Sequence, residues 1–187
     1  MVQFLTTCPK ILGLLEGFYR TMPAHPPLDV VVVEPSVLPD PQRRLLVHDN
    51  DMTSTLTGHH REKIVLRVLQ QTSANGSLSR HIVLESAVSR EPVEYGASSI
   101  GLDILDDRVR SDVIEGKKPL GGILNEHGVA YSNCPGAFFK VRSNDLMNRL
   151  FGLDESNWLY GRCNCLTDSI GRAIAEVVEI LPPHAET

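Results

Sequence analysis

The chain has 187 residues, 42% of them hydrophobic, and a formal net charge of −5 at pH 7. This length and apolar content suit one globular domain with a sizeable core and exclude an intrinsically disordered chain. The acidic balance argues against non-specific nucleic-acid binding, and no apolar run approaches the roughly 20 residues that span a bilayer. Because Lys10 and Glu16 interrupt the N-terminal apolar stretch, we expect no signal peptide and a cytoplasmic location.

The first sixty residues predict short helices and one extended segment. Apolar side chains recur at helical spacing in residues 10–20, and prolines then interrupt the chain. Residues 28–33 are rich in valine and predict a strand or a buried extended segment. Two short helices follow, one with Asp40 as its expected N-cap and Pro41 in its first turn, the other capped by Asp51.

The rest of the chain predicts strands joined by turns, with helices inserted between them. Strands are expected over residues 62–71, 79–89, 92–104, 129–141, 158–167 and 172–181. The Asn75-Gly76 dipeptide predicts a tight hairpin between the first two strands. Helices are expected over residues 106–116 and 119–126, and after a cap at Ser143. This succession indicates an α+β fold, and we expect residues 1–187 to form a single domain with its core at 41–183.

Arg80 stands in the middle of an apolar strand, on the same face as Ile82 and Leu84. An inward-facing arginine is costly unless an anion pairs with it. One interpretation is a structural ion pair with Glu176 or Glu179. The other is a bidentate clamp on the carboxylate of a ligand, which the planar guanidinium suits.

Four other positions are candidates for a binding site. Glu176 and Glu179 lie three residues apart in the last strand, so at most one of them faces a core-side cavity. A carboxyl group in such a cavity resists ionisation and can hold or accept a proton. Met52 and Leu120 lie at expected helix starts, where unpaired backbone N–H groups can bind an anion, although Leu120 also fits a simple helix entry.

Standard catalytic signatures are absent from the sequence: it contains no G-x-S-x-G, no P-loop, no H-E-x-x-H and no strand-linked G-x-G-x-x-G. Cys163 and Cys165 lack the second ligand pair that a zinc site requires, and we expect the cysteines to be reduced. No metal site is therefore expected.

Five short segments share one property, which is their order along the chain. They are Asp49-Asn50-Asp51-Met52-Thr53, Ser79-Arg80-His81-Ile82-Val83-Leu84, Lys118-Pro119-Leu120-Gly121, Leu159-Tyr160-Gly161-Arg162 and Ala175-Glu176-Val177-Val178-Glu179-Ile180-Leu181-Pro182. In this order and at these spacings they resemble the chorismate lyase family, which removes pyruvate from chorismate to leave a hydroxybenzoate. The resemblance covers residues 41–183.

The resemblance implies a fold, a reaction and a set of site residues. The fold would be a single antiparallel sheet of about six strands, with inserted helices that close an internal ligand pocket. Arg80 and Glu179 would be catalytic, with Arg80 holding the carboxylate of chorismate and Glu176 as the alternative glutamate. Met52, Leu120 and Arg162 would complete the substrate-binding set. The implied activity is a chorismate pyruvate-lyase that favours 4-hydroxybenzoate and needs no metal or organic cofactor.

A second interpretation is a non-catalytic sensor domain of the same fold that binds an aromatic acid. Family lyases carry further arginines where this chain has Ala97 and Cys163, and a bound hydroxybenzoate needs only one cationic clamp. Such sensors usually follow a winged-helix domain, which we do not expect before residue 41. In both interpretations the partner is a small molecule, and the protein is a monomer or a homodimer.

Overall fold

The computed structural model describes residues 13–17, 19 and 28–183. Residues 13–17 and 19 are helical. The rest of the helix expected over 10–20 lies outside the described residues. The following elements are β1 (Val30–Val33), η1 (Pro35–Val37), α2 (Gln42–Leu46), α3 (Met52–His60), β2 (Ile64–Ala74), β3 (Ser77–Ser86), β4 (Pro92–Gly101), α4 (Asp107–Glu115), α5 (Leu120–Glu126), β5 (Tyr131–Arg142), α6 (Asp145–Phe151), β6 (Trp158–Asp168) and β7 (Ala173–Leu181).

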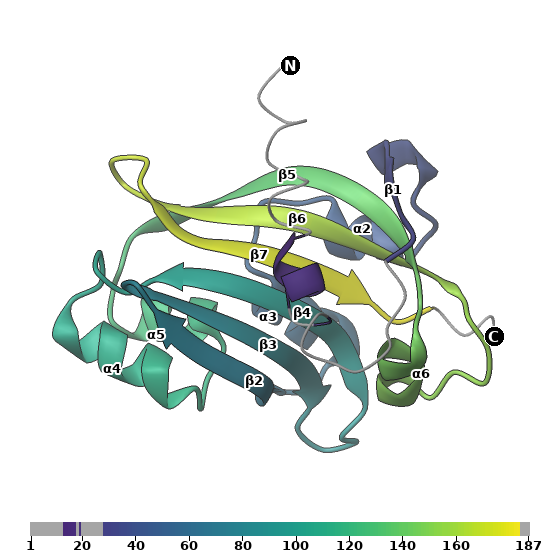
Figure 1. Cartoon of the computed structure of the whole chain (residues 1–187), viewed down its shortest axis with the longest axis horizontal. Coiled ribbons are helices and arrows are strands. Elements are labelled where there is room, and N and C mark those ends of the chain that lie inside the picture. Colours follow the sequence, from purple (N-terminus) through teal and green to yellow (C-terminus); the bar gives the residue numbers. More distant parts are fainter. Residues whose placement is uncertain (1–12, 18, 20–27, 184–187) are drawn as a thin grey trace.

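The seven strands form one antiparallel sheet in the order β1-β5-β6-β7-β4-β3-β2 (Figure 1). The expected α+β class, with helices inserted around a single antiparallel sheet, is confirmed. The sheet has seven strands rather than about six, because the valine run forms β1 and pairs with β5, Val30 lying opposite Val141. Residues before position 41 therefore belong to the sheet.

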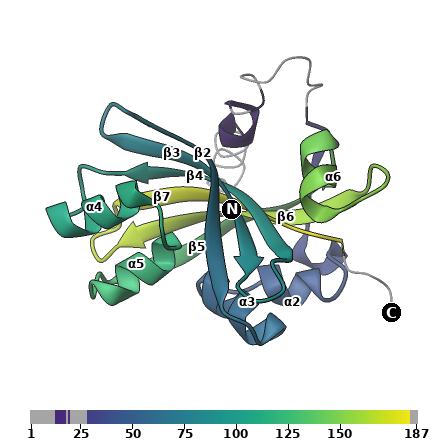
Figure 2. The same ribbon diagram turned by 90° about the horizontal axis from the view of Figure 1, so that it is seen from below.

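Different helices cover the two faces of the sheet (Figure 2). On one face, α6 and the helical residues 13–17 and 19 contribute Leu15, Tyr19 and Met147 to a core with side chains such as Phe139 and Val178. On the other face, α2 and α3 cover one end and α4 and α5 cover the other end, each pair over its own apolar cluster. The candidate site lies between these two clusters and is lined by side chains from both.

Local sequence explains most of the element boundaries. Asn75 and Gly76 both adopt positive φ, at 50° and 73°, as the tight β2–β3 hairpin requires. The carboxylate of Asp51 caps α3 by accepting a hydrogen bond from the Ser54 N–H group. Two expected caps differ: Pro41 rather than Asp40 precedes α2, and Asn144 rather than Ser143 caps α6, its side chain accepting from the Met147 N–H group.

Gly161 in β6 allows the central strands to pack closely. It lies directly opposite Phe139 of β5, whose aromatic ring occupies the space beside it. A Cβ atom at position 161 would lie 2.6 Å from Cζ of Phe139, well inside van der Waals contact. An aromatic ring over a cross-strand glycine fills the gap that the missing side chain leaves.

Candidate functional site

One face of the sheet is hollowed between the two apolar clusters. The cavity has a volume of about 80 Å³, which is room for several water molecules. Its apolar lining consists of Met52, Leu66, Ile82, Leu84, Leu120, Leu166 and Val177. Its polar lining includes Asp51, Arg80, Glu94, Ser98, Tyr131, Asn133 and Glu179. The cavity is therefore mostly apolar with a few convergent polar groups, the usual composition of a small-molecule site.

The structure brings four of the predicted site residues to this cavity. Arg80 projects from β3 and Glu179 from β7, while Met52 and Leu120 are the first residues of α3 and α5. The sheet order explains the meeting, because β4 separates β3 from β7 and places all three strands under the same pair of helix starts. Residues far apart in the sequence thus share one cavity.

Arg80 is buried, with only 3% of its surface exposed, and has little to compensate its charge. Its Nη1 donates a hydrogen bond to the carbonyl oxygen of Val113 at 3.3 Å, in the last turn of α4. Its Nε is buried without a hydrogen-bond partner, and no carboxylate within the described residues forms an ion pair with it. Burial lowers the pKa of Arg80 to about 10, so the guanidinium stays charged at neutral pH and attracts an anion.

Glu179 does not pair with Arg80, because it pairs with Arg162. The two residues lie directly opposite each other on β7 and β6, and Arg162 Nε donates to Oε2 of Glu179. The structural pair between Arg80 and Glu179, one of the two interpretations of the sequence, is therefore not formed.

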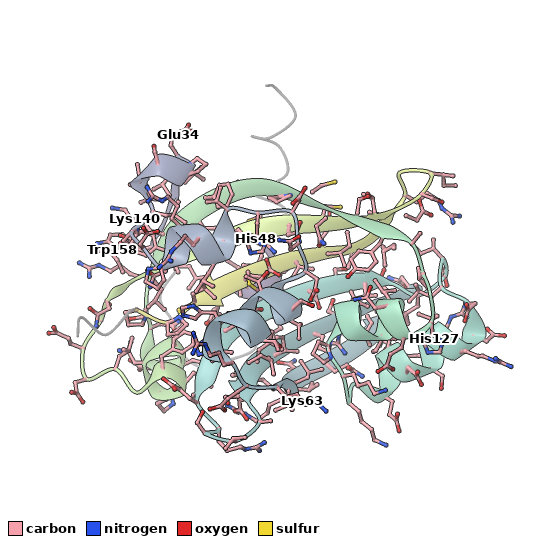
Figure 3. The ribbon with its side chains drawn as sticks, turned by 180° about the vertical axis from the view of Figure 1, so that it is seen from behind. Glu34, His48, Lys63, His127, Lys140 and Trp158 are labelled. Carbon is pink, nitrogen blue, oxygen red and sulfur yellow. The ribbon has the colours of Figure 1, made fainter. Side chains whose placement is uncertain are left out.

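Arg162, predicted to bind substrate, lies elsewhere. It is fully buried and is not among the cavity-lining residues. Besides Glu179, it binds the backbone between α2 and α3, where Nη1 donates to the carbonyl oxygens of Leu46 at 3.0 Å and His48 at 2.8 Å. Figure 3 shows His48 in front of the yellow C-terminal strands, where this anchoring takes place. Arg162 thus fixes the segment leading into α3 and supports the site from behind.

Glu176 also lies away from the cavity. Alternation along β7 puts Val177 and Glu179 on the cavity face, and Glu176 on the other face, half-buried opposite Ser99 of β4. Its three-residue separation from Glu179 predicted this difference between the two glutamates. The geometry thus assigns the cavity position to Glu179.

Glu94 in β4 is a cavity residue that the sequence reasoning missed. It is 3% exposed, and its Oε2 is buried without a hydrogen-bond partner. Burial, followed by the nearby charge of Glu179, raises the pKa of Glu94 well above its ordinary value, which favours the protonated form of this carboxyl group. The signal was present in the sequence, because Glu94 interrupts an apolar strand in the same way that Arg80 does.

The two helix starts at the rim differ in how their N–H groups are used. Asp51 caps α3 with its own carboxylate, whereas α5 follows Pro119 and has no side-chain cap. A Cβ atom at Gly121 would lie 3.4 Å from Oδ1 of Asp51, so the two helix starts approach each other closely. The negative charge of Asp51 at the rim opposes the entry of a further anion beyond one that Arg80 attracts.

Metal and membrane sites receive no support from the described chain. Within residues 13–17, 19 and 28–183, no three His, Cys, Asp or Glu side chains gather as a metal site would require. Across the same residues, no helix has the length and apolarity needed to cross a membrane.

Comparisons with known proteins show the fold. No protein-family model matches the chain, and no curated protein matches it. Among solved structures, PhnF from Mycobacterium smegmatis matches with a TM-score of 0.56 and 10% identity over 75% of this chain and 71% of PhnF. The effector domain of the same PhnF matches with a TM-score of 0.54 and 10% identity over 71% of this chain and 88% of that domain. A transcriptional regulator of the GntR family from Bacillus cereus gives a TM-score of 0.46 and 12% identity over 66% of this chain and 96% of the regulator.

These similarities correct the prediction of an enzyme. The fold is chorismate lyase-like, and the solved structure that shares it over 88% of its own length is an effector domain. The prediction of a chorismate pyruvate-lyase is contradicted by this finding.

Proposed function

We propose that this chain is a non-catalytic domain that binds a small carboxylic acid, such as an aromatic acid, in the cavity between β3, β4, β7 and the starts of α3 and α5. The observation that carries the proposal is the buried guanidinium of Arg80, which lines the cavity without an ion-pair partner in the described chain. A buried charge of this kind is costly to fold and is compensated when an anion binds. The similarity to an effector domain supports a binding role over a catalytic one.

The charge balance of the cavity favours a carboxylate over a doubly charged phosphate. Arg80 supplies one positive charge, and the charge of Arg162 is already matched by Glu179. Asp51 at the rim adds a negative charge. A ligand with one negative charge would neutralise Arg80, whereas a second charge would find no second cation among the lining residues.

Isothermal titration calorimetry tests this proposal. The purified chain is titrated with benzoate, 4-hydroxybenzoate and inorganic phosphate, and we expect the aromatic acids to bind and phosphate to bind weakly. Arg80→Met should abolish binding of the acids, while Arg108→Met, which removes an exposed arginine of α4, should bind them like the wild type. Acid binding that survives in Arg80→Met would contradict the proposal, as would pyruvate release on incubation with chorismate.

A further inference from the structure

Glu94 and Glu179 form a pair of carboxyl groups that the proposed binding of a carboxylate does not use. They lie on β4 and β7 as diagonal neighbours, because Gly96 is directly opposite Glu179 and Glu94 is two residues from Gly96 on the same face. Gly96 leaves the space that Glu94 needs, since a Cβ atom there would lie 3.1 Å from Oε1 of Glu94. Both carboxyl groups consequently reach the same region of the cavity floor.

Among the described residues, only one cation, Arg162, pairs with these two carboxyl groups. Arg162 donates its Nε hydrogen bond to Glu179, whereas Glu94 makes no hydrogen bond or ion pair within the described residues. Two buried carboxyl groups that share one cation do not both ionise, and the unpaired one keeps its proton. Glu94 is therefore a hydrogen-bond donor, and Glu179 is an acceptor with its Oε1 still unused.

The register of the strands sets the distance between Arg80 and the Glu94–Glu179 pair. Ser98 lies opposite Arg80 on β4, and Gly96 lies opposite Glu179, so the levels of Arg80 and Glu179 differ by two residues along the strands. Two strand spacings also separate them sideways, which puts their Cα atoms about 12 Å apart. Both side chains line the cavity, and this separation leaves room for one small ring between them.

We propose that Glu94 is a specificity residue that donates a hydrogen bond to an uncharged oxygen of the ligand and excludes a second negative charge. This inference rests on the proposed function, because Arg80 must hold the single carboxylate of the same ligand. A hydroxyl group is the best partner, since it accepts from Glu94 and donates to Glu179 at the same time. The ligand class is thus a hydroxy-substituted monocarboxylic acid.

Calorimetry with a matched set of acids at pH 7 tests the inference. The set is benzoate, 3- and 4-hydroxybenzoate, and the dicarboxylates isophthalate and terephthalate. We expect one of the hydroxybenzoates to bind about tenfold more tightly than benzoate, as one hydrogen bond to a charged or strongly polar group would give. Both dicarboxylates should bind more weakly than benzoate.

Variants of Glu94 then test whether the preference for a hydroxyl group comes from the hydrogen bond that Glu94 donates or from the shape of its side chain. Glu94→Leu removes the donor, and the ratio of the affinity for the hydroxybenzoate to the affinity for benzoate should fall to about one. Glu94→Gln keeps a donor and should retain the preference for hydroxyl. Glu91→Gln, an exposed change in the turn before β4, is the control for the loss of a glutamate. Thermal unfolding of each variant verifies that it is folded.

The outcomes distinguish this inference from the proposed function. A hydroxyl preference that persists in Glu94→Leu would overturn the role of Glu94, and so would dicarboxylates that bind as tightly as hydroxybenzoates. Benzoate binding that depends on Arg80 without any hydroxyl preference in the wild type would overturn the inference and leave the proposed function standing. Absence of Arg80-dependent binding of every acid would overturn both.

Discussion

Replacing Arg80 with methionine should stabilise the ligand-free protein while abolishing its binding. Burial lowers the pKa of Arg80 from 12.5 to about 10, which corresponds to about 3 kcal/mol against the charged form. The variant loses the hydrogen bond to the Val113 carbonyl oxygen, worth about 1 kcal/mol. Methionine keeps most of the apolar stem in place. The net expectation is a gain of about 2 kcal/mol in the free energy of unfolding, or about 4–8 °C in Tm.

Urea denaturation followed by circular dichroism, with and without ligand, measures both effects. At a concentration of 4-hydroxybenzoate of about 100 times Kd, the wild type should gain about 2.7 kcal/mol, whereas Arg80→Met should gain nothing. A variant that unfolds at a lower urea concentration than the ligand-free wild type would refute the reasoning. Such a result would mean that Arg80 has a structural partner that compensates its charge. The exposed change Arg108→Met is the control for the loss of a surface arginine.

Three further changes test other features of the site. Because burial and Glu179 raise the pKa of Glu94 above its ordinary value of 4.5, the folded state holds a proton that the unfolded state releases. The free energy of unfolding of the wild type should therefore fall as the pH rises above 4.5, by up to about 1.4 kcal/mol per pH unit. Glu94→Gln keeps the Glu179–Arg162 pair and has no such proton to lose, so its free energy of unfolding should fall much less. Urea titrations between pH 5 and 8 measure both. Gly161→Ala should cost about 2–3 kcal/mol in the same assay because the new methyl group overlaps the aromatic ring opposite, and an unchanged urea midpoint would contradict this packing. Asp51→Asn keeps an acceptor for the cap of α3 but removes a negative charge from the cavity rim. Calorimetry should therefore show that this variant binds benzoate about two- to fivefold more tightly than the wild type. Equal or weaker binding would show that Asp51 does not repel the ligand.

Local sequence rules predicted the elements well where one residue decides the backbone. The Asn75-Gly76 turn and the Asp51 cap are examples, since both depend on side chains within a few residues. The rules failed at α6, where Ser143 and Asn144 are both good caps in sequence. The structure uses Asn144 because Ser143 Oγ accepts a hydrogen bond from the Asn157 N–H group, fourteen residues away.

Only some charged residues of the candidate site could be predicted from the sequence. Arg80 was predicted as a site residue because it is a lone charge in an apolar strand. Strand alternation predicted that at most one of Glu176 and Glu179 faces the cavity. Pairing across the sheet could not be predicted, because it depends on the order of strands. The place of β7 between β6 and β4 decides that Arg162 serves Glu179 and that Glu94 is left without a cation. The same reasoning that selected Arg80 would have selected Glu94.

The strand order has a consequence for how the protein reaches its native state. β1 pairs with β5, and β4 pairs with β7, so strands distant in sequence must meet before the sheet is complete. Chains with such distant pairings fold slowly, because loop closure precedes the contacts that reward it. The residues that line the cavity are spread from Asp51 to Glu179. The cavity therefore forms only after segments distant in the sequence have packed together. A ligand that binds here would therefore recognise only the completed fold and would serve as a reporter of the last steps of folding.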